Sequence, residues 1–204
     1  TALWIAEAQM MKETENIIHQ DMDFFPLKSY TNIVEGNALR MDWNEVVPAE
    51  ELNYIMGNPP FVGYSLQSES QKQDILDIMV DEDGKQLKAA GKADYVAGWY
   101  YKSASYMQNE RIQAALVSTN SIVQGEQVAG VWGPLIEKYG IYINFAYKTF
   151  RWDSEANAKA HVHCVIIGFS NYSTDIKKRI FDGDVIYHAD HINPYLVDAS
   201  DILI

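Results

Sequence analysis

The chain has 204 residues, of which 48% are hydrophobic and 22% are charged, the balance of an ordinary globular protein. No apolar run approaches the roughly 18 residues of a membrane-spanning helix, no secretory signal opens the chain, and the single cysteine, Cys164, excludes an internal disulfide bond. We therefore expect a cytoplasmic protein with no membrane contact. The net charge of −12 argues against a free-standing nucleic-acid-binding module, which would carry a basic patch.

The first half of the chain predicts two helices and two strands. Helical spacing of apolar residues covers residues 1–19, and a short apolar run over 32–34 predicts a strand. The run over 52–56 predicts a buried strand. Ser68 or Ser70 is suited to cap the helix that follows it.

The second half alternates strands and helices. Asp94 is expected to cap a helix whose apolar-aromatic stripe, residues 96–107, faces the core. The later elements are a strand over 112–117, a helix over 125–138 that ends at Gly140, and strands over 142–147 and 161–169 joined by a polar loop. This order predicts an α/β fold with a mostly parallel sheet, and the loop between the last two strands predicts a hairpin with one antiparallel strand.

The tetrapeptide Asn58-Pro59-Pro60-Phe61 directly follows the strand over 52–56 and is the most informative stretch of the chain. Asn58 offers a side-chain amide with an acceptor and two donors. The two prolines fix the backbone and remove two N–H groups, so nearby carbonyls stay free to accept from another molecule. Phe61 adds a flat apolar face. The set suits a planar group with an exocyclic amine, although a proline-stiffened strand end packed under an aromatic ring is the structural alternative.

The tetrapeptide resembles the Asn/Asp-Pro-Pro-aromatic motif of amino-group methyltransferases that use S-adenosylmethionine. Six ordered blocks extend the resemblance to the catalytic domain of DNA adenine-N6 methyltransferases, and among these to the MmeI-like group of single-chain restriction–modification enzymes. The blocks are residues 2–10, 33–43, 57–63, 93–101, 117–127, and 150–152 with 161–169.

The resemblance implies a Rossmann-like methyltransferase fold, with residues 1–172 as part of the catalytic domain and 173–204 as a linker or the start of a target-recognition domain. Such enzymes carry a glycine-rich cofactor loop after their first strand, and no such loop precedes the helix over 1–19. We therefore expect a domain truncated at its N-terminal end, cut from a longer protein, that binds S-adenosylmethionine weakly alone. Double-stranded DNA would be bound through the full-length protein, which would add a specificity domain and possibly a nuclease.

The resemblance also assigns roles in the motif. The side chain of Asn58 and the carbonyl of Pro59 would accept the two N6–H bonds of a flipped adenine, Pro60 would hold the corner, and Phe61 would stack on the base. The cofactor would contact Asn37, Ala38 and Leu39, with Asn37 reaching the adenine amine of the cofactor. A plain turn residue after Gly36 is the alternative for Asn37.

The loop between the last two strands supplies the remaining candidates. Either Phe150 or Trp152 is expected to stack on the extruded base. Lys148 and Arg151 are candidates for DNA phosphate contacts, although two cations in an exposed loop are usually only solvated. His161 and His163 share a strand face but have no third ligand nearby in the sequence, so no metal site is expected.

Two other functions fit the same residues. A methyltransferase acting on protein glutamine or on an RNA base could use the same motif chemistry. A non-catalytic scaffold that braces a DNA-specificity domain would account for the acidic charge and the lack of a glycine-rich loop.

Overall fold

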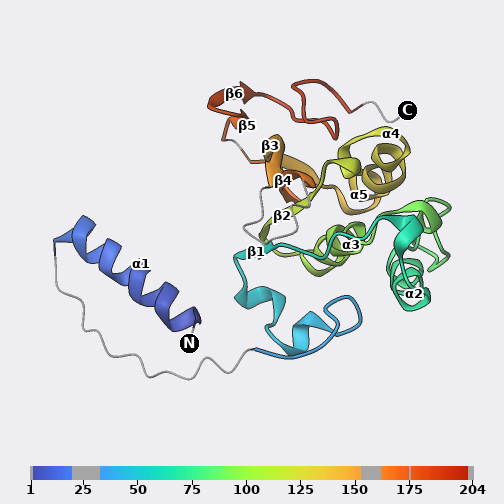
Figure 1. Ribbon diagram of the computed structural model, residues 1–204, viewed down its shortest axis with the longest axis horizontal. Coiled ribbons are helices and arrows are strands. Elements are labelled where there is room, and N and C mark those ends of the chain that lie inside the picture. Colours follow the sequence, from blue (N-terminus) through green and yellow to red (C-terminus); the bar gives the residue numbers. More distant parts are fainter. Residues whose placement is uncertain (1, 20–32, 153–161, 175, 202–204) are drawn as a thin grey trace. The chain divides into compact units, whose positions relative to one another are not determined.

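The computed structural model describes residues 2–19, 33–152, 162–174 and 176–201 (Figure 1). The chain divides into two units, residues 1–33 and 34–204. The first unit contains helix α1 (Ala2–Ile18), which confirms the helix predicted over residues 1–19. Along the described part of the chain, no helix combines the length and apolar character needed to cross a membrane.

The second unit is built on a six-stranded sheet with the order β1-β2-β4-β3-β5-β6 (Figure 1). The strands are β1 (Tyr54–Gly57), β2 (Gln113–Thr119), β3 (Tyr142–Trp152), β4 (Val162–Ser170), β5 (Lys178–Asp182) and β6 (Val185–Ala189). β1 pairs parallel with β2, and β3 pairs parallel with β5. β4 runs antiparallel to both β2 and β3, and β6 runs antiparallel to β5. Four strands therefore point one way, which confirms the predicted mixed α/β fold, and β4 is the predicted antiparallel strand.

The burial of the strands follows their places in the sheet. β4 lies between β2 and β3, and its residues from Cys164 to Ser170 are buried apart from Ile166, which explains the continuous apolar run in the sequence. β2 alternates buried and half-buried positions, as a strand does when its two faces differ in cover.

The helices of the second unit are α2 (Glu69–Ile78), α3 (Ala97–Tyr106), α4 (Gly125–Gln127) and α5 (Gly133–Tyr139), with a π-helical segment (Val128–Trp132) between α4 and α5. Short 3-10 helices cover Trp43–Glu45, Ala49–Glu51, Tyr64–Leu66, Ala90–Lys92 and Asn120–Val123. Ser68 caps α2 in a reciprocal capping box with Gln71, as predicted for Ser68. Gly140 ends α5 in the left-handed conformation with φ 62°, also as predicted.

The core lies where α3 and the π-helical segment meet the sheet. Tyr100 of α3 stacks on Phe169 of β4 with ring centroids 5.3 Å apart, and Trp132 meets Tyr100 edge-on at 5.4 Å. The Tyr100 hydroxyl and the Ser118 hydroxyl of β2 are 2.8 Å apart, so both buried oxygens have a partner. The aromatic stripe over residues 96–107 is thus core, as expected.

Several predicted boundaries were wrong. Residues 33 and 34 form no strand, and residue 32 lies outside the described residues. Asp94 does not cap α3, whose N-cap is Val96. The helix over 125–138 is interrupted by its π-helical segment. β3 continues to Trp152 instead of giving way to a loop at residue 148.

Beyond residue 172 the sheet continues. The hairpin of β5 and β6 lies at the far edge from β1, and the Tyr147 and Phe181 rings stack 4.2 Å apart across the β3–β5 pairing. The domain boundary at 172 stays a prediction, but the segment after it contains two strands of the same sheet.

Candidate functional site

The Asn-Pro-Pro-Phe tetrapeptide lies at the carboxyl end of β1. Gly57, the last residue of β1, is paired with Leu116 of β2, and a Cβ on it would be only 3.2 Å from the Leu116 side chain. This close approach brings the carboxyl ends of the two parallel strands together. Asn58 follows as an exposed residue, Pro59 is buried, and Phe61 is half-buried. The Asn58 amide therefore faces solvent at the edge of the sheet and is not part of the core.

The loop after the motif is held in place by the buried carboxylate of Asp94, the residue predicted to cap α3. Asp94, only 8% exposed, accepts a hydrogen bond from the backbone N–H of Tyr64 at 3.0 Å. Its second oxygen accepts from the Ser121 hydroxyl, in the turn that follows β2. Asp94 thereby connects the two turns that leave the carboxyl ends of β1 and β2.

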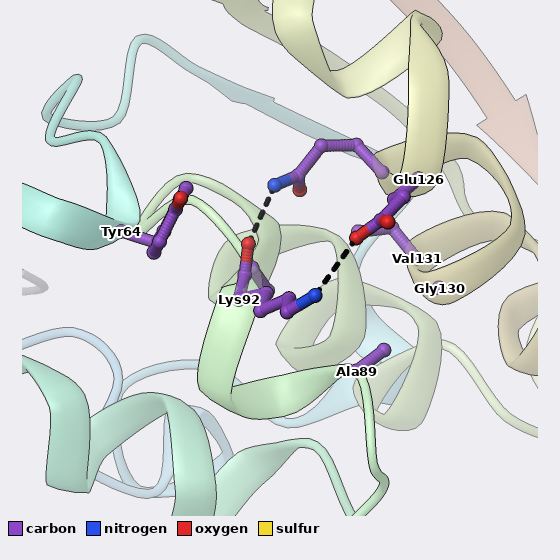
Figure 2. Close-up of a pocket in the computed structure, with 8 residues that line it drawn as sticks. Tyr64, Ala89, Lys92, Glu126, Gly130 and Val131 are labelled. Atoms are coloured by element: carbon purple, nitrogen blue, oxygen red, sulfur yellow. Dashed lines mark hydrogen bonds and ion pairs between the residues drawn. The ribbon is translucent and has the colours of Figure 1, made fainter.

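A cavity of about 190 Å³ lies beside this loop, with Tyr64 at its rim (Figure 2). Lys92 and Glu126 form an ion pair at 3.1 Å across it, and the Gln127 side chain donates to the Lys92 carbonyl at 2.6 Å. Gly130 closes the far wall, because a Cβ there would lie 2.6 Å from the Ala89 Cβ. The cavity was not foreseen, since its lining comes from three separate segments.

The predicted cofactor turn, residues 37–39, is tied to α2. The Asn37 amide donates to Asp74 at 2.9 Å, while its oxygen accepts from the Leu39 backbone N–H at 2.9 Å. Leu39 is buried in the core, and the Ala38 carbonyl accepts from the Trp43 indole at 2.8 Å. Asn37 thus adopts the turn role that was its alternative, and its contact with a cofactor stays a prediction.

Asp74 is a buried carboxylate at the centre of a network that reaches the surface through Asn37 and Arg40. Besides Asn37, it accepts from Arg40 at 2.6 Å and from the Tyr95 hydroxyl at 2.8 Å. Burial alone would raise the pKa of Asp74, but hydrogen bonds from Arg40, Tyr95 and Asn37 outweigh it and hold the pKa below the usual 3.8. The carboxylate is therefore ionised at neutral pH with three donors around it.

This network predicts an acid-dependent contribution to stability. Because the pKa of Asp74 is lower in the folded chain than the ordinary 3.8, its stabilisation is complete above that value and is lost as the pH falls through it towards the folded pKa. Asp74→Asn should therefore reduce the unfolding free energy at pH 7 more than at pH 3. Urea denaturation of both proteins at a series of pH values measures this difference. A difference that does not change with pH would contradict the assignment.

The remaining candidates lie on β3 and not in a loop. Phe150 is half-buried, Trp152 is 45% exposed, and their rings are 6.1 Å apart. Lys148 forms an ion pair with Asp182 at 3.3 Å, and Arg151 is exposed. β3 runs in the same direction as β1, so its carboxyl end, with these side chains, lies on the same side of the sheet as the motif. Three strand spacings, about 14 Å, separate the two strands, and the stacking of either ring on the base stays a prediction.

Of the two candidate histidines, one lies in the described part of the chain. His163 is exposed on β4, and His161 lies outside the described residues. Cys164 is buried, and burial raises the pKa of its thiol.

Comparison with known proteins agrees with this geometry. The family model described as "MmeI, DNA-methyltransferase domain" matches residues 1–182. "DNA methyltransferase A" of Bacillus subtilis (strain 168) is 40% identical over 206 residues, covering 100% of this chain and 23% of that protein. The structure of the Type IIL restriction–modification enzyme MmeI in complex with DNA is 44% identical, with a TM-score of 0.84, and the match covers 98% of this chain and 27% of that one.

The chain thus spans about a quarter of the length of each of these relatives. The family model covers most of the chain, including the Asn-Pro-Pro-Phe corner at the end of β1 and the first four strands of the sheet together with β5. The chain belongs to the MmeI family of DNA-methyltransferase domains.

Proposed function

We propose that this chain is the part of an S-adenosylmethionine-dependent DNA methyltransferase that holds a target adenine and allows its N6 amine to be methylated. The observation that carries the proposal is the exposed Asn58 amide beside a proline-locked corner, at the carboxyl end of a parallel strand in a DNA-methyltransferase family member. Ligands of open α/β sheets bind outside these strand ends.

The residues of the corner suit an amine that is a poor nucleophile. The lone pair of an adenine amine is delocalised into the ring. Two acceptors, the Asn58 side-chain oxygen and the Pro59 carbonyl, draw both N–H bonds to one side and stabilise the positive charge that develops on the nitrogen. Alignment of the amine with the methyl donor supplies much of the remaining acceleration. No nucleophilic side chain is required.

The donor group that fits this chemistry is S-adenosylmethionine, whose sulfonium carries an electrophilic methyl group. The turn over residues 37–39 is suited to hold its adenine. The Asn37 oxygen already accepts one bond from Leu39, but an amide oxygen has a second lone pair that can accept from the adenine amine. The outer edge of β1 exposes Tyr54 by 67% and Met56 by 84%, so its backbone is open to pairing with another segment.

The flipped base would be stacked on Phe61, which repays part of the unstacking energy. Phe150 or Trp152 would be a second ring stacked on the extruded base, and Lys148 and Arg151 of β3 would contact the DNA backbone. Specificity and any nuclease activity would come from the other domains of a full-length restriction–modification enzyme, and a cytoplasmic location belongs to the same proposal.

The test uses the full-length protein that carries this chain. Incubation with double-stranded DNA and labelled S-adenosylmethionine, followed by nucleoside mass spectrometry, should yield N6-methyladenine. Calorimetric titration should show cofactor binding by the full-length protein and much weaker binding by the 204-residue chain.

The outcomes separate the alternatives. Label in RNA or in protein glutamine, with none in DNA, would overturn the substrate. Cofactor binding without any transfer, or no cofactor binding at all, would favour a scaffold that braces a specificity domain.

A further inference from the structure

Two consecutive buried residues before α3, Asp94 and Tyr95, contact both halves of the proposed site. Both are almost completely buried, at 8% and 4% exposure. Neither was assigned a role at the site from the sequence. Together they bond to the loop after the motif, to the turn after β2, and to the network that holds the cofactor turn.

Asp94 fixes the loop that follows the motif. It accepts from the Tyr64 backbone N–H at 3.0 Å and from the Ser121 hydroxyl, and Ser121 in turn lies 2.7 Å from the Thr119 hydroxyl. The backbone N–H of Asp94 donates to the Gln127 side chain at 3.4 Å. Because both carboxylate oxygens have partners on different segments, the loop after Phe61 is fixed to the end of β2.

Tyr95 bonds both to the loop after the motif and to the network of the cofactor turn. Its backbone N–H donates to the Val62 carbonyl at 2.9 Å, one residue after Phe61. Its hydroxyl donates to Asp74 at 2.8 Å, the carboxylate that also binds Asn37 and Arg40. One residue thus joins the motif loop, through its backbone, to the cofactor turn, through its side chain.

We propose that Asp94 and Tyr95 are positioning residues for methyl transfer: Asp94 sets the motif loop against the turn after β2, and the Tyr95 hydroxyl sets the cofactor turn through Asp74. The proposal rests on the proposed function, since it assigns the two turns to base and cofactor. Neither residue needs to touch a substrate. Each acts by keeping a loop in the one arrangement that aligns amine and methyl group, where small displacements are costly.

The physical basis is the loss or weakening of hydrogen bonds to buried carboxylates. Asp94→Asn removes the negative charge, so the bond from the Tyr64 N–H is no longer charge-assisted. The new NH2 group can only donate to the Ser121 hydroxyl, which must then turn its proton towards Thr119. Tyr95→Phe removes only the hydroxyl and keeps the edge-on ring contact with Trp99 at 5.1 Å. Both substitutions are small enough for the fold to survive, and they affect different turns.

The experiment measures kinetics and hydrogen exchange in the full-length protein. Asp94→Asn should lower kcat roughly tenfold with little change in the KM for S-adenosylmethionine, because the motif loop that positions the target base is displaced while the cofactor turn is not. Tyr95→Phe should raise the dissociation constant for S-adenosylmethionine roughly fivefold and leave kcat at saturating cofactor within about twofold. Hydrogen exchange should accelerate over residues 61–66 in the first variant and over 37–41 in the second.

Matched controls come from the same part of the fold. Tyr101→Phe removes another buried hydroxyl, bonded to the Val131 carbonyl at 3.2 Å, and should change neither constant. Asp77→Asn removes an exposed acid whose partner is Gln73, and should also be silent.

Equal losses of kcat and cofactor affinity in both variants, or loop exchange that accelerates while kinetics stay normal, would overturn the positioning role. Failure of the proposed function is a separate result. If the wild-type protein methylates nothing, the function is wrong, while unchanged exchange over residues 61–66 and 37–41 in the two variants would independently refute the positioning.

Discussion

Replacing Asn58 with alanine in the full-length protein should lower the rate of DNA methylation by at least about 10²-fold, the usual effect of removing one preorganised polar contact. The side chain is exposed at the end of β1, so its loss creates no core cavity. Affinity for S-adenosylmethionine should not change, because the cofactor turn is tied to Asp74 and not to Asn58. Single-turnover kinetics at saturating cofactor, with calorimetry for binding, measure the two quantities separately.

Two further variants test whether the acceptor oxygen is what matters. Asn53→Ala changes another exposed asparagine just before the same strand, whose backbone carbonyl still accepts from Gln113, and should be silent. Asn58→Asp keeps acceptor oxygens at the corner and should retain more activity than Asn58→Ala, because the motif that the tetrapeptide resembles accepts either residue. Near-normal turnover in Asn58→Ala would remove the proposed role of Asn58.

The strand that carries the motif could be predicted because its signals are local. The apolar run before Gly57, the two prolines and the capping box at Ser68 each depend on residues close in sequence. Backbone restriction and capping need no distant partner, so the positions of these elements were correct to within a few residues. The predicted burial of the strand was wrong, because β1 is an edge strand that exposes Tyr54 and Met56.

Asp94 shows why the site around the motif could not be predicted in the same way. An acidic residue before an apolar stripe is the ordinary pattern of a helix N-cap. Here the helix begins two residues later than that pattern implies, and the carboxylate bonds to Tyr64 and Ser121, which are 30 and 27 residues away. Nothing in the local sequence distinguishes these two uses of one aspartate, because the difference lies in tertiary partners.

The hairpin after residue 172 was missed for a different reason. In β6, Val185, Ile186 and Tyr187 form a continuous apolar run although each is about half exposed. The sequence therefore shows no alternation of polar and apolar residues that would identify a half-exposed strand. β5 does alternate at Lys178, Arg179 and Ile180, but a buried lysine hides the pattern. Lys178 is accommodated because its ammonium donates to the Asp190 carbonyl at 3.3 Å.

Gly168→Ala should cost about 3 kcal/mol of stability, the upper part of the usual range for overpacking. Gly168 is buried in β4 directly opposite Phe145 of β3. A Cβ there would lie 2.0 Å from the nearest Phe145 ring carbon and within 2.6 Å of two more. The ring covers the glycine, so the added methyl group must displace the ring or separate the two strands. Native-state hydrogen exchange of β3 and β4 amides in the full-length protein measures the change.

The same experiment needs a glycine with free space and a variant that removes the ring. Gly91→Ala meets no atom within 4 Å and should change stability by less than about 0.5 kcal/mol. Phe145→Leu should relieve the clash, so that the double variant with Gly168→Ala is more stable than the sum of the two single changes implies. Additive effects would mean that the ring is not what excludes the methyl group. Because β4 joins β2 to β3, loss of this contact should also speed hydrogen exchange at the end of β3 that carries Phe150 and Trp152. The amides of β1, which pairs with β2 alone, should keep their protection against exchange.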